Sequence, residues 1–259
     1  MDHVDRLETG LATDLCAVTR AFEEAAISYA VIGANALILQ EITLPRTTRD
    51  LDLVVIAEEG LDRLRSILEG HGLRSTSIAH RFVTSRGSEV DILPLSPEDG
   101  PDIEFPDGER ITAVGLPEAV RNAQGIETGP CALRVAPLPI LAAIKLHAAT
   151  VRVGDRDLTD ALAIMEQFES TGNRRFELDY QAAPALVWET AGAFLLGQDA
   201  GSMLDESTRH RVADAIEILL NDPRLGANHS QGEGRAPLLH AFRAGLVPDA
   251  STEDAAAPS

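Results

Sequence analysis

The sequence has few of the features that mark membrane, secreted or zinc-binding proteins. No apolar run approaches the roughly 20 residues that a membrane-spanning helix needs, and the acidic N-terminal segment lacks the basic and apolar regions of a secretory signal. Only two cysteines occur, Cys16 and Cys131, far apart and outside any CxxC pair. Neither a disulfide framework nor a zinc site is therefore indicated. We expect both cysteines to be small buried apolar residues, and the protein to be cytoplasmic and away from membranes.

Basic residues are also scarce, with 22 Lys and Arg against 41 Asp and Glu, which gives a formal net charge of −19. Such a surface repels polyanions unless a local basic patch overrides it. The charge therefore counts against broad nucleic-acid binding, while solubility or a salt-adapted source explains it without any function. The chain also lacks a P-loop and a GxSxG motif, and its histidines from His71 onward never fall into metal-ligand spacing.

The first half of the chain alternates predicted helices and strands. Apolar residues recur at helical spacing over residues 3–25, and residues 27–32 form a β-branched strand that ends at Gly33 and leads into a helix. Residues 51–57 are apolar at nearly every position, which is typical of a central strand covered on both faces. A helix is expected over residues 58–70, followed by two strands joined by a hairpin at Arg86-Gly87.

The second half is predicted to be mostly helical. Helical patterns cover residues 138–151, 157–169, 181–197, 206–221 and 237–244, separated by a loop over 222–236. Trp188, Phe194, Leu195 and Leu196 are expected in the core of these helices. The sequence thus predicts an α+β protein with a mixed-sheet domain over 1–136, a helical domain over 137–247 and a disordered tail over 248–259.

One segment, PRTTRDLDLVV at residues 45–55, carries a pattern that points to chemistry. In an extended segment alternate side chains share a face, so Arg46, Thr48, Asp50 and Asp52 would project to the same side. Neighbouring carboxylates repel each other unless a cation neutralises them, and their oxygens suit Mg²⁺ or Mn²⁺. The DxD motif is weak by itself, and an exposed strand start that happens to carry two aspartates is the alternative.

Two further residues give this segment a context. Gly33 opens a helix directly after a strand, a geometry in which free backbone N–H groups bind phosphate; the alternative is a glycine needed only for the turn. Asp91 lies in a predicted apolar strand, where an unpaired charge costs several kcal/mol unless it meets a partner or a metal. The alternative for Asp91 is a place on an edge strand, facing water.

Lys145 is the only formally charged residue between Pro137 and Val151, in a helix otherwise rich in Leu, Ile and Ala. A buried ammonium requires an anionic partner, and either a triphosphate or a carboxylate would serve. Asp160, near the start of the next predicted helix, is a candidate partner. A purely structural ion pair between the two helices is the alternative, although such a pair can coexist with nucleotide binding.

Together these residues follow a family pattern. The order of strand, Gly33-Ala34, helix, the RxTxDhD segment from Arg46 to Asp52 (h being apolar) and a later strand with Asp91 resembles the DNA polymerase beta-like nucleotidyltransferases. Within that superfamily the sequence is most similar to the AbiEii-type enzymes, the toxin half of type IV toxin–antitoxin systems. The resemblance extends to the lysine-bearing helix and covers roughly residues 27–165. Ala34 departs from the usual second Gly or Ser, which removes a hydroxyl but leaves the backbone N–H donors.

The resemblance implies a nucleotidyltransferase-fold mixed sheet and the Mg²⁺-dependent transfer of an NMP from an NTP to an acceptor hydroxyl. It makes three residues catalytic and ligands of Mg²⁺ or Mn²⁺: Asp50, Asp52 and Asp91. It makes a further set nucleotide-binding: Gly33, Ala34, Arg46, Thr48, Arg49, Lys145 and Asp160. The expected acceptor is tRNA or another cellular target, with a cognate antitoxin as partner. The alternatives are a small-molecule nucleotidyltransferase that modifies an aminoglycoside-like acceptor, and a non-catalytic module that binds nucleotide or a partner protein.

Overall fold

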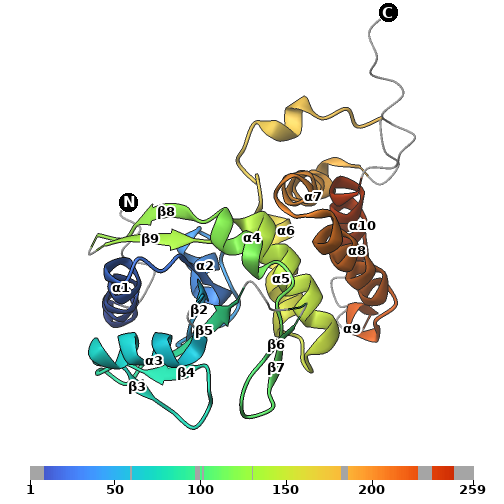
Figure 1. Ribbon diagram of the computed structural model, residues 1–259. Coiled ribbons are helices and arrows are strands. Elements are labelled where there is room, and N and C mark those ends of the chain that lie inside the picture. Colours follow the sequence, from blue (N-terminus) through green and yellow to red (C-terminus); the bar gives the residue numbers. More distant parts are fainter. Residues whose placement is uncertain are drawn as a thin grey trace, which may run out of the picture. The chain divides into compact units, whose positions relative to one another are not determined.

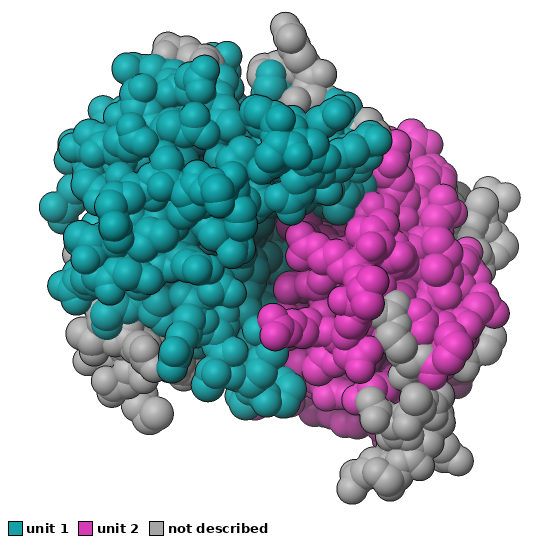
Figure 2. Space-filling model, turned by 90° about the horizontal axis from the view of Figure 1, so that it is seen from below, with its two compact units in different colours: residues 1–141 teal, residues 142–259 magenta. Residues whose placement is uncertain are grey.

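The computed structural model (Figure 1) describes residues 9–58, 60–96, 100, 102–129, 131–181, 186–226 and 235–247. Its contacts divide the chain into two compact units, residues 1–141 and 142–259, which Figure 2 shows in different colours. The predicted boundary at 136/137 stays a prediction. The predicted tail over 248–259 and the first eight residues lie outside the described part of the chain.

A seven-stranded mixed sheet forms the centre of the first unit. Its strands are β1 (Tyr29–Ile32), β2 (Leu51–Ile56), β3 (Arg74–Ser75), β4 (Arg81–Val83), β5 (Glu89–Leu95), β8 (Gln124–Glu127) and β9 (Ala132–Val135). They lie in the order β3-β4-β5-β2-β1-β9-β8, with β2 parallel to β5 and antiparallel to β1. Leu51, Leu53, Val54 and Val55 of β2 are fully buried. The prediction of a central strand covered on both faces is confirmed.

Helices flank this sheet, as the α+β prediction requires (Figure 1). They are α1 (Thr9–Glu24), α2 (Gly33–Leu39), α3 (Gly60–Gly70) and α4 (Leu116–Arg121), and a small hairpin is formed by β6 (Asp102–Glu104) and β7 (Arg110–Thr112). Helix α1 contacts α3 and β9, and α4 packs against β1 and β2. Leu11, Leu15, Val18 and Phe22 are buried, so the predicted amphipathic helix is confirmed from Thr9 onward.

The two cysteines form a disulfide between α1 and the β8–β9 connection. The Cys16 and Cys131 sulfur atoms lie 1.98 Å apart, although the residues are separated by 115 positions in the sequence. The prediction of two unpaired apolar cysteines is therefore wrong. Spacing along the chain did not reveal the pair, because only the packing of α1 on β9 brings them together.

The second unit is helical. It contains most of α5 (Leu138–Val151), followed by α6 (Arg156–Gln167), α7 (Ala191–Met203), α8 (Glu206–Leu220), α9 (Pro223–Gly226), α10 (Arg235–Leu246) and the short 3-10 helices η2 (Arg174–Glu177) and η3 (Trp188–Thr190). Four of the predicted helices are confirmed within a few residues. Of the helix predicted over 181–197, the part from Ala191 is confirmed, and residues 182–185 lie outside the described part of the chain. The prediction is wrong at Val187, which is extended and whose N–H donates to the Thr190 hydroxyl in a tight turn. The predicted loop after 221 begins with the one-turn α9, and residues 227–234 lie outside the described part.

Trp188 packs in an exposed group of aromatic side chains, and the prediction that it lies in the core is wrong. Trp188 is 45% exposed and Phe176 is 74% exposed. The two ring centroids lie 5.0 Å apart, and the Tyr180 ring lies 6.4 Å from that of Trp188. Trp188 is thus not the core residue that the sequence predicted, because it belongs to the turn before α7 and not to the helix itself.

Candidate active site

The first feature of the site is the close approach of Gly33 to Asp52. Strand β1 ends at Ile32, which is the register partner of Asp52 on β2. Gly33 follows with φ +69°, and a β-carbon there would overlap Oδ2 of Asp52 and lie 2.7 Å from its Cγ. Glycine supplies both the left-handed backbone and the missing side chain. The carboxylate of Asp52 therefore lies directly against the turn that opens α2, where Ala34 is also buried.

Asn35 connects the DxD segment to α2. Asp50 is exposed and immediately precedes β2, and its backbone carbonyl accepts a 2.7 Å hydrogen bond from Nδ2 of Asn35. Asn35 is fully buried, and its Oδ1 has no hydrogen-bond partner among the described residues. This hydrogen bond holds the backbone at Asp50 in place. Asn35 carries no signal in the sequence, because a single asparagine in an apolar helix belongs to no motif.

Asp91 lies inside the sheet and is paired with an arginine. Its strand, β5, lies between β2 and β4, so the edge-strand alternative is wrong. Asp91 is in register with Asp52 on one side and with Arg81 on the other. Nε of Arg81 donates to Oδ1 at 2.7 Å and Nη2 donates to Oδ2 at 2.8 Å. These hydrogen bonds raise the pKa of Arg81 above its ordinary value, although burial acts in the opposite direction.

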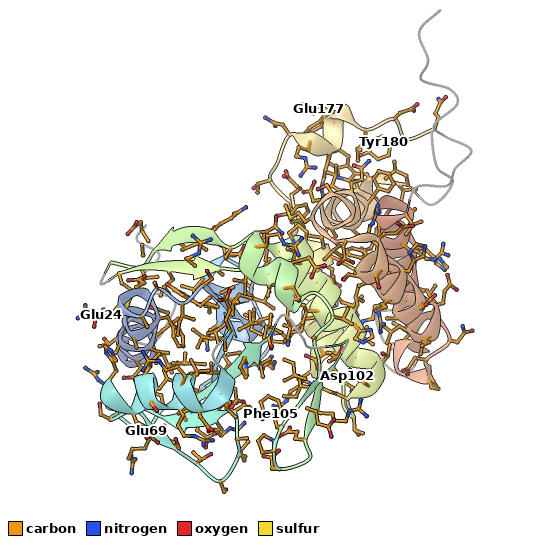
Figure 3. The ribbon with its side chains drawn as sticks, viewed as in Figure 1. Glu24, Glu69, Asp102, Phe105, Glu177 and Tyr180 are labelled. Atoms are coloured by element: carbon orange, nitrogen blue, oxygen red, sulfur yellow. A yellow bond between two sulfur atoms is a disulfide. The ribbon has the colours of Figure 1, made fainter. Side chains whose placement is uncertain are left out.

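A buried histidine lies beside this pair. His80 is 5% exposed, with Nε2 4.0 Å from Oδ1 of Asp91 and Nδ1 3.5 Å from Oε2 of Glu109. Its ring packs against Phe105, which Figure 3 labels, at a centroid distance of 4.9 Å. The sequence did not single out His80, because its acidic neighbours come from β5 and from the β6–β7 hairpin.

Arg46 and Thr48 line a pocket next to the DxD segment. Strand β2 begins only at Leu51 and residues 43–50 form no strand, so the predicted alternation of side chains does not extend back to these two residues. They border an open pocket of about 560 Å³. Its remaining lining residues are Leu11, Asn35, Ile38, Glu41, Ile42, Thr43, Leu44 and Thr47. The lining thus combines hydroxyl groups and charges with aliphatic side chains, while Arg49, nearer the strand, is exposed.

Lys145 forms an ion-pair cluster in the second unit. Its Nζ lies 2.7 Å from Oδ1 of Asp157 and 3.0 Å from Oδ2 of Asp160, two residues of α6. The Asp160 side chain is fully buried, and Arg152 lies 3.7 Å from the other oxygen of Asp157. The ion pair predicted between the two helices is confirmed. Within this unit the two carboxylates neutralise the lysine.

The carboxylates of the first unit fit a divalent cation only in part. Asp50 and Asp52 offer oxygens of the kind that Mg²⁺ prefers, and Mg²⁺ commonly binds one or two carboxylates together with water and substrate phosphates. Both oxygens of Asp91, the predicted third ligand, accept hydrogen bonds from Arg81. Over the described part of the chain, no group of three or more His, Cys, Asp or Glu residues is arranged to hold a metal ion. The chemistry of Asp50 and Asp52 therefore fits one divalent ion.

Comparison with protein families gives a match to the model described as nucleotidyl transferase AbiEii toxin, type IV TA system, over residues 16–252. Among solved structures, ANT(2'')-Ia in complex with adenylyl-2''-tobramycin is 17% identical with a TM-score of 0.43, covering 66% of this chain and 94% of that chain. The lincomycin-bound lincosamide antibiotic adenylyltransferase LnuA is 13% identical with a TM-score of 0.40, covering 58% and 94%. JHP933 from Helicobacter pylori is 13% identical with a TM-score of 0.37, covering 92% and 89%.

Two further findings concern the chain as a whole. A search of the curated proteins finds no match to this chain. Among the described residues, no helix is long and apolar enough to cross a membrane.

Proposed function

Because this chain belongs to the AbiEii nucleotidyltransferase family of type IV toxin–antitoxin systems, we propose that it uses Mg²⁺ (or Mn²⁺) and an NTP to modify a hydroxyl group of RNA. The observation that carries this proposal is the carboxylate of Asp52 lying against the bare backbone at Gly33. That arrangement brings a cation ligand and backbone donors for phosphate to the same place. A cognate antitoxin is the proposed partner, and the cytoplasm, where NTP and RNA are available, is the proposed location.

The proposed reaction is an in-line displacement at the α-phosphorus. The acceptor hydroxyl oxygen forms a new bond to the α-phosphorus, the bond from that phosphorus to the oxygen bridging to the β-phosphate breaks, and pyrophosphate leaves. The hydroxyl proton passes to Asp91. A divalent ion, when bound, neutralises phosphate charge and increases the acidity of the hydroxyl.

The chain's own residues hold the triphosphate in this proposal. Asp50 and Asp52 bind the divalent ion, and the backbone amides of Gly33 and Ala34 donate to phosphate oxygens. The cationic groups proposed to neutralise the phosphates are Arg46 and Arg49. The nucleotide-binding role that the family resemblance implies for Lys145 and Asp160 stays a prediction. Such preorganised donors stabilise charge that develops during phosphoryl transfer.

We place the sugar and base of the nucleotide in the pocket beside the DxD segment. Its volume of about 560 Å³ lies within the roughly 300–1,000 Å³ that is usual for small-molecule sites. Thr48 and Arg46 lie on its wall only a few residues before Asp50, and Asn35 belongs both to the pocket and to the contact with Asp50. The aliphatic lining suits a base, and the threonine hydroxyls suit a ribose.

The decisive experiment follows label from each α-³²P-labelled NTP, with Mg²⁺ and total cellular RNA, into the RNA fraction. The wild-type chain is expected to label RNA with one preferred NTP, and the isosteric variants Asp50→Asn and Asp52→Asn should label none. EDTA should abolish the labelling. Retained transfer by a folded double variant would overturn the assignment of the carboxylate pair.

One observation favours a second acceptor class. The net charge of −19 opposes the approach of RNA and attracts cationic small molecules. The same labelled NTPs should therefore be offered to an aminoglycoside in parallel reactions. Label in the aminoglycoside and none in RNA would select the small-molecule alternative, and Mg²⁺-dependent NTP binding without turnover on any acceptor would select a non-catalytic module.

A further inference from the structure

Three charged side chains form a row across neighbouring strands of the sheet. Asp52 on β2 is in register with Asp91 on β5, and Asp91 is in register with Arg81 on β4. Side chains of directly paired residues lie on the same face of a sheet, next to each other. The arginine therefore lies on the far side of Asp91 from Asp52, on the face that carries the DxD carboxylate.

Arg81 engages both oxygens of Asp91. The two hydrogen bonds, at 2.7 and 2.8 Å, occupy one lone pair on each carboxylate oxygen in a bidentate arrangement, and Nη1 of Arg81 lies 3.2 Å from Oε2 of Glu89. The Arg81 and Asp91 side chains are 29% and 17% exposed, so solvent screens the pair only partly. Bidentate arginine–carboxylate pairs are strong and directional, and a guanidinium keeps its charge at every pH that a protein survives. A divalent ion on Asp91 would have to share both oxygens with the guanidinium and lie next to its positive charge, and this repulsion opposes a second cation there.

We propose that Arg81 takes the place of a second divalent cation on Asp91, so that this chain loads a single divalent ion, on Asp50 and Asp52. The inference rests on the proposed function, since it takes Asp50 and Asp52 as the metal ligands. Arg81 is then a positioning residue that orients Asp91 and supplies fixed positive charge on the face of the sheet that carries Asp52. The absence of any metal-holding group of three or more His, Cys, Asp or Glu among the described residues agrees with this assignment.

The test counts Mn²⁺ ions bound to the full chain, using the electron paramagnetic resonance signal of free Mn²⁺ during titration with the metal alone. Wild type should bind one ion tightly, and Asp50→Asn/Asp52→Asn should bind none. Asp91→Asn should still bind one. Arg81→Ala frees the Asp91 carboxylate and should bind two ions, the second of which is lost again in Arg81→Ala/Asp91→Asn.

Arg174→Ala is the matched control, because Arg174 holds Asp199 in the second unit with two hydrogen bonds of the same lengths, 2.7 Å from Nη1 and 2.8 Å from Nη2. It exposes an equivalent carboxylate away from the DxD segment in the sequence, and it should leave the count at one. A second tight ion in Arg174→Ala would mean that any freed carboxylate on this acidic chain binds Mn²⁺, and that result would overturn the specific role of Arg81.

Other outcomes separate the two proposals. Two tight ions on wild type, with one lost in Asp91→Asn, would overturn the role of Arg81 while leaving the proposed function intact. An unchanged count in Asp50→Asn/Asp52→Asn would instead remove the metal site of the proposed function. The Asp91→Asn comparison needs no change at Arg81, so the inference stays testable even where Arg81→Ala fails to fold.

Discussion

The α-carbon of Gly33 lies against the carboxylate of Asp52, so that a β-carbon at position 33 would overlap Oδ2 and lie 2.7 Å from Cγ. The backbone at Gly33 also has φ +69°, a conformation that other residues adopt at a cost. Two independent effects therefore exclude a side chain at this position. The left-handed backbone would make a side chain here lower the stability of the fold, and the overlap would displace Asp52, a proposed metal ligand.

We expect Gly33→Ala to lower kcat/KM for nucleotidyl transfer by roughly 100-fold or more, because displacing a reacting-site group by about 1 Å has an effect of that size. The left-handed backbone should also lower the free energy of unfolding by about 1–2 kcal/mol. Gly72→Ala is the control, since Gly72 has φ +86° but open space around its α-carbon. It should show the loss of stability in urea and keep the activity. Equal activity in the two variants would contradict the proposed role of the Gly33–Asp52 contact.

Because we place the nucleoside in the pocket next to the DxD segment, a substitution in this pocket should weaken binding of the nucleoside end of the NTP and leave binding of the triphosphate end unchanged. Thr47 is exposed and lines the pocket. Thr47→Trp should weaken NTP binding roughly tenfold or more, because the indole would occupy space meant for the sugar and base. Binding of tripolyphosphate with Mg²⁺ should be unchanged, since it uses the Gly33 and Asp52 end.

Isothermal titration calorimetry measures both ligands in this test. Thr171→Trp places the same side chain at an exposed threonine of the second unit and should leave both affinities unchanged. Equal NTP affinities in wild type and Thr47→Trp would remove the nucleoside from this pocket.

The disulfide predicts a stability that depends on redox conditions. Because it closes a loop of 115 residues, Cys131→Ser should lower the free energy of unfolding by about 4–5 kcal/mol on the chain-entropy model. A thiol reductant should lower the stability of the wild type by a similar amount and leave the variant unchanged. Chemical denaturation with and without reductant provides the measurement. A wild type that is insensitive to reductant would show that the two sulfur atoms contribute no cross-link to stability.

In the second unit, the close packing of α7 against α10 requires glycines at the helix crossing. A β-carbon on Gly245 would overlap the carbonyl oxygen of Phe194 and lie 2.8 Å from the backbone nitrogen of Gln198. Gly245→Ala should lower the free energy of unfolding by about 1–3 kcal/mol, because overpacking forces the helices apart.

Gly10→Ala is the matched helical control for this variant, since a β-carbon on Gly10 of α1 would meet no atom within 4 Å among the described residues. It should raise stability by up to about 1 kcal/mol, because alanine favours a helix over glycine. Urea unfolding of both variants gives the comparison, and a stabilised Gly245→Ala would contradict the close packing of the two helices.

Local patterns predicted the secondary structure where one face of an element is buried. The apolar residues of β2 and the helical repeat of α1 recur at the spacing of their own element, so a short stretch of sequence contains the information. The helix prediction failed over residues 186–190, where the Thr190 hydroxyl accepts a hydrogen bond from the Val187 N–H in a tight turn before α7. It also failed at Trp188, whose apolar character alone suggested burial.

The sequence by itself determined the carboxylate pair Asp50 and Asp52, the glycine before α2 and the family to which the chain belongs, because these lie in short motifs that need no distant partner. Only the tertiary structure decided what each motif residue meets. Strand register places Asp91 between Asp52 and Arg81, and helix packing joins Cys16 to Cys131. The strand register and the disulfide both depend on hydrogen bonding and packing between segments that are separated in the sequence, so no local pattern contains them. The sequence therefore predicted Asp91 as a third metal ligand, and only the fold reveals that Arg81 donates two hydrogen bonds to it.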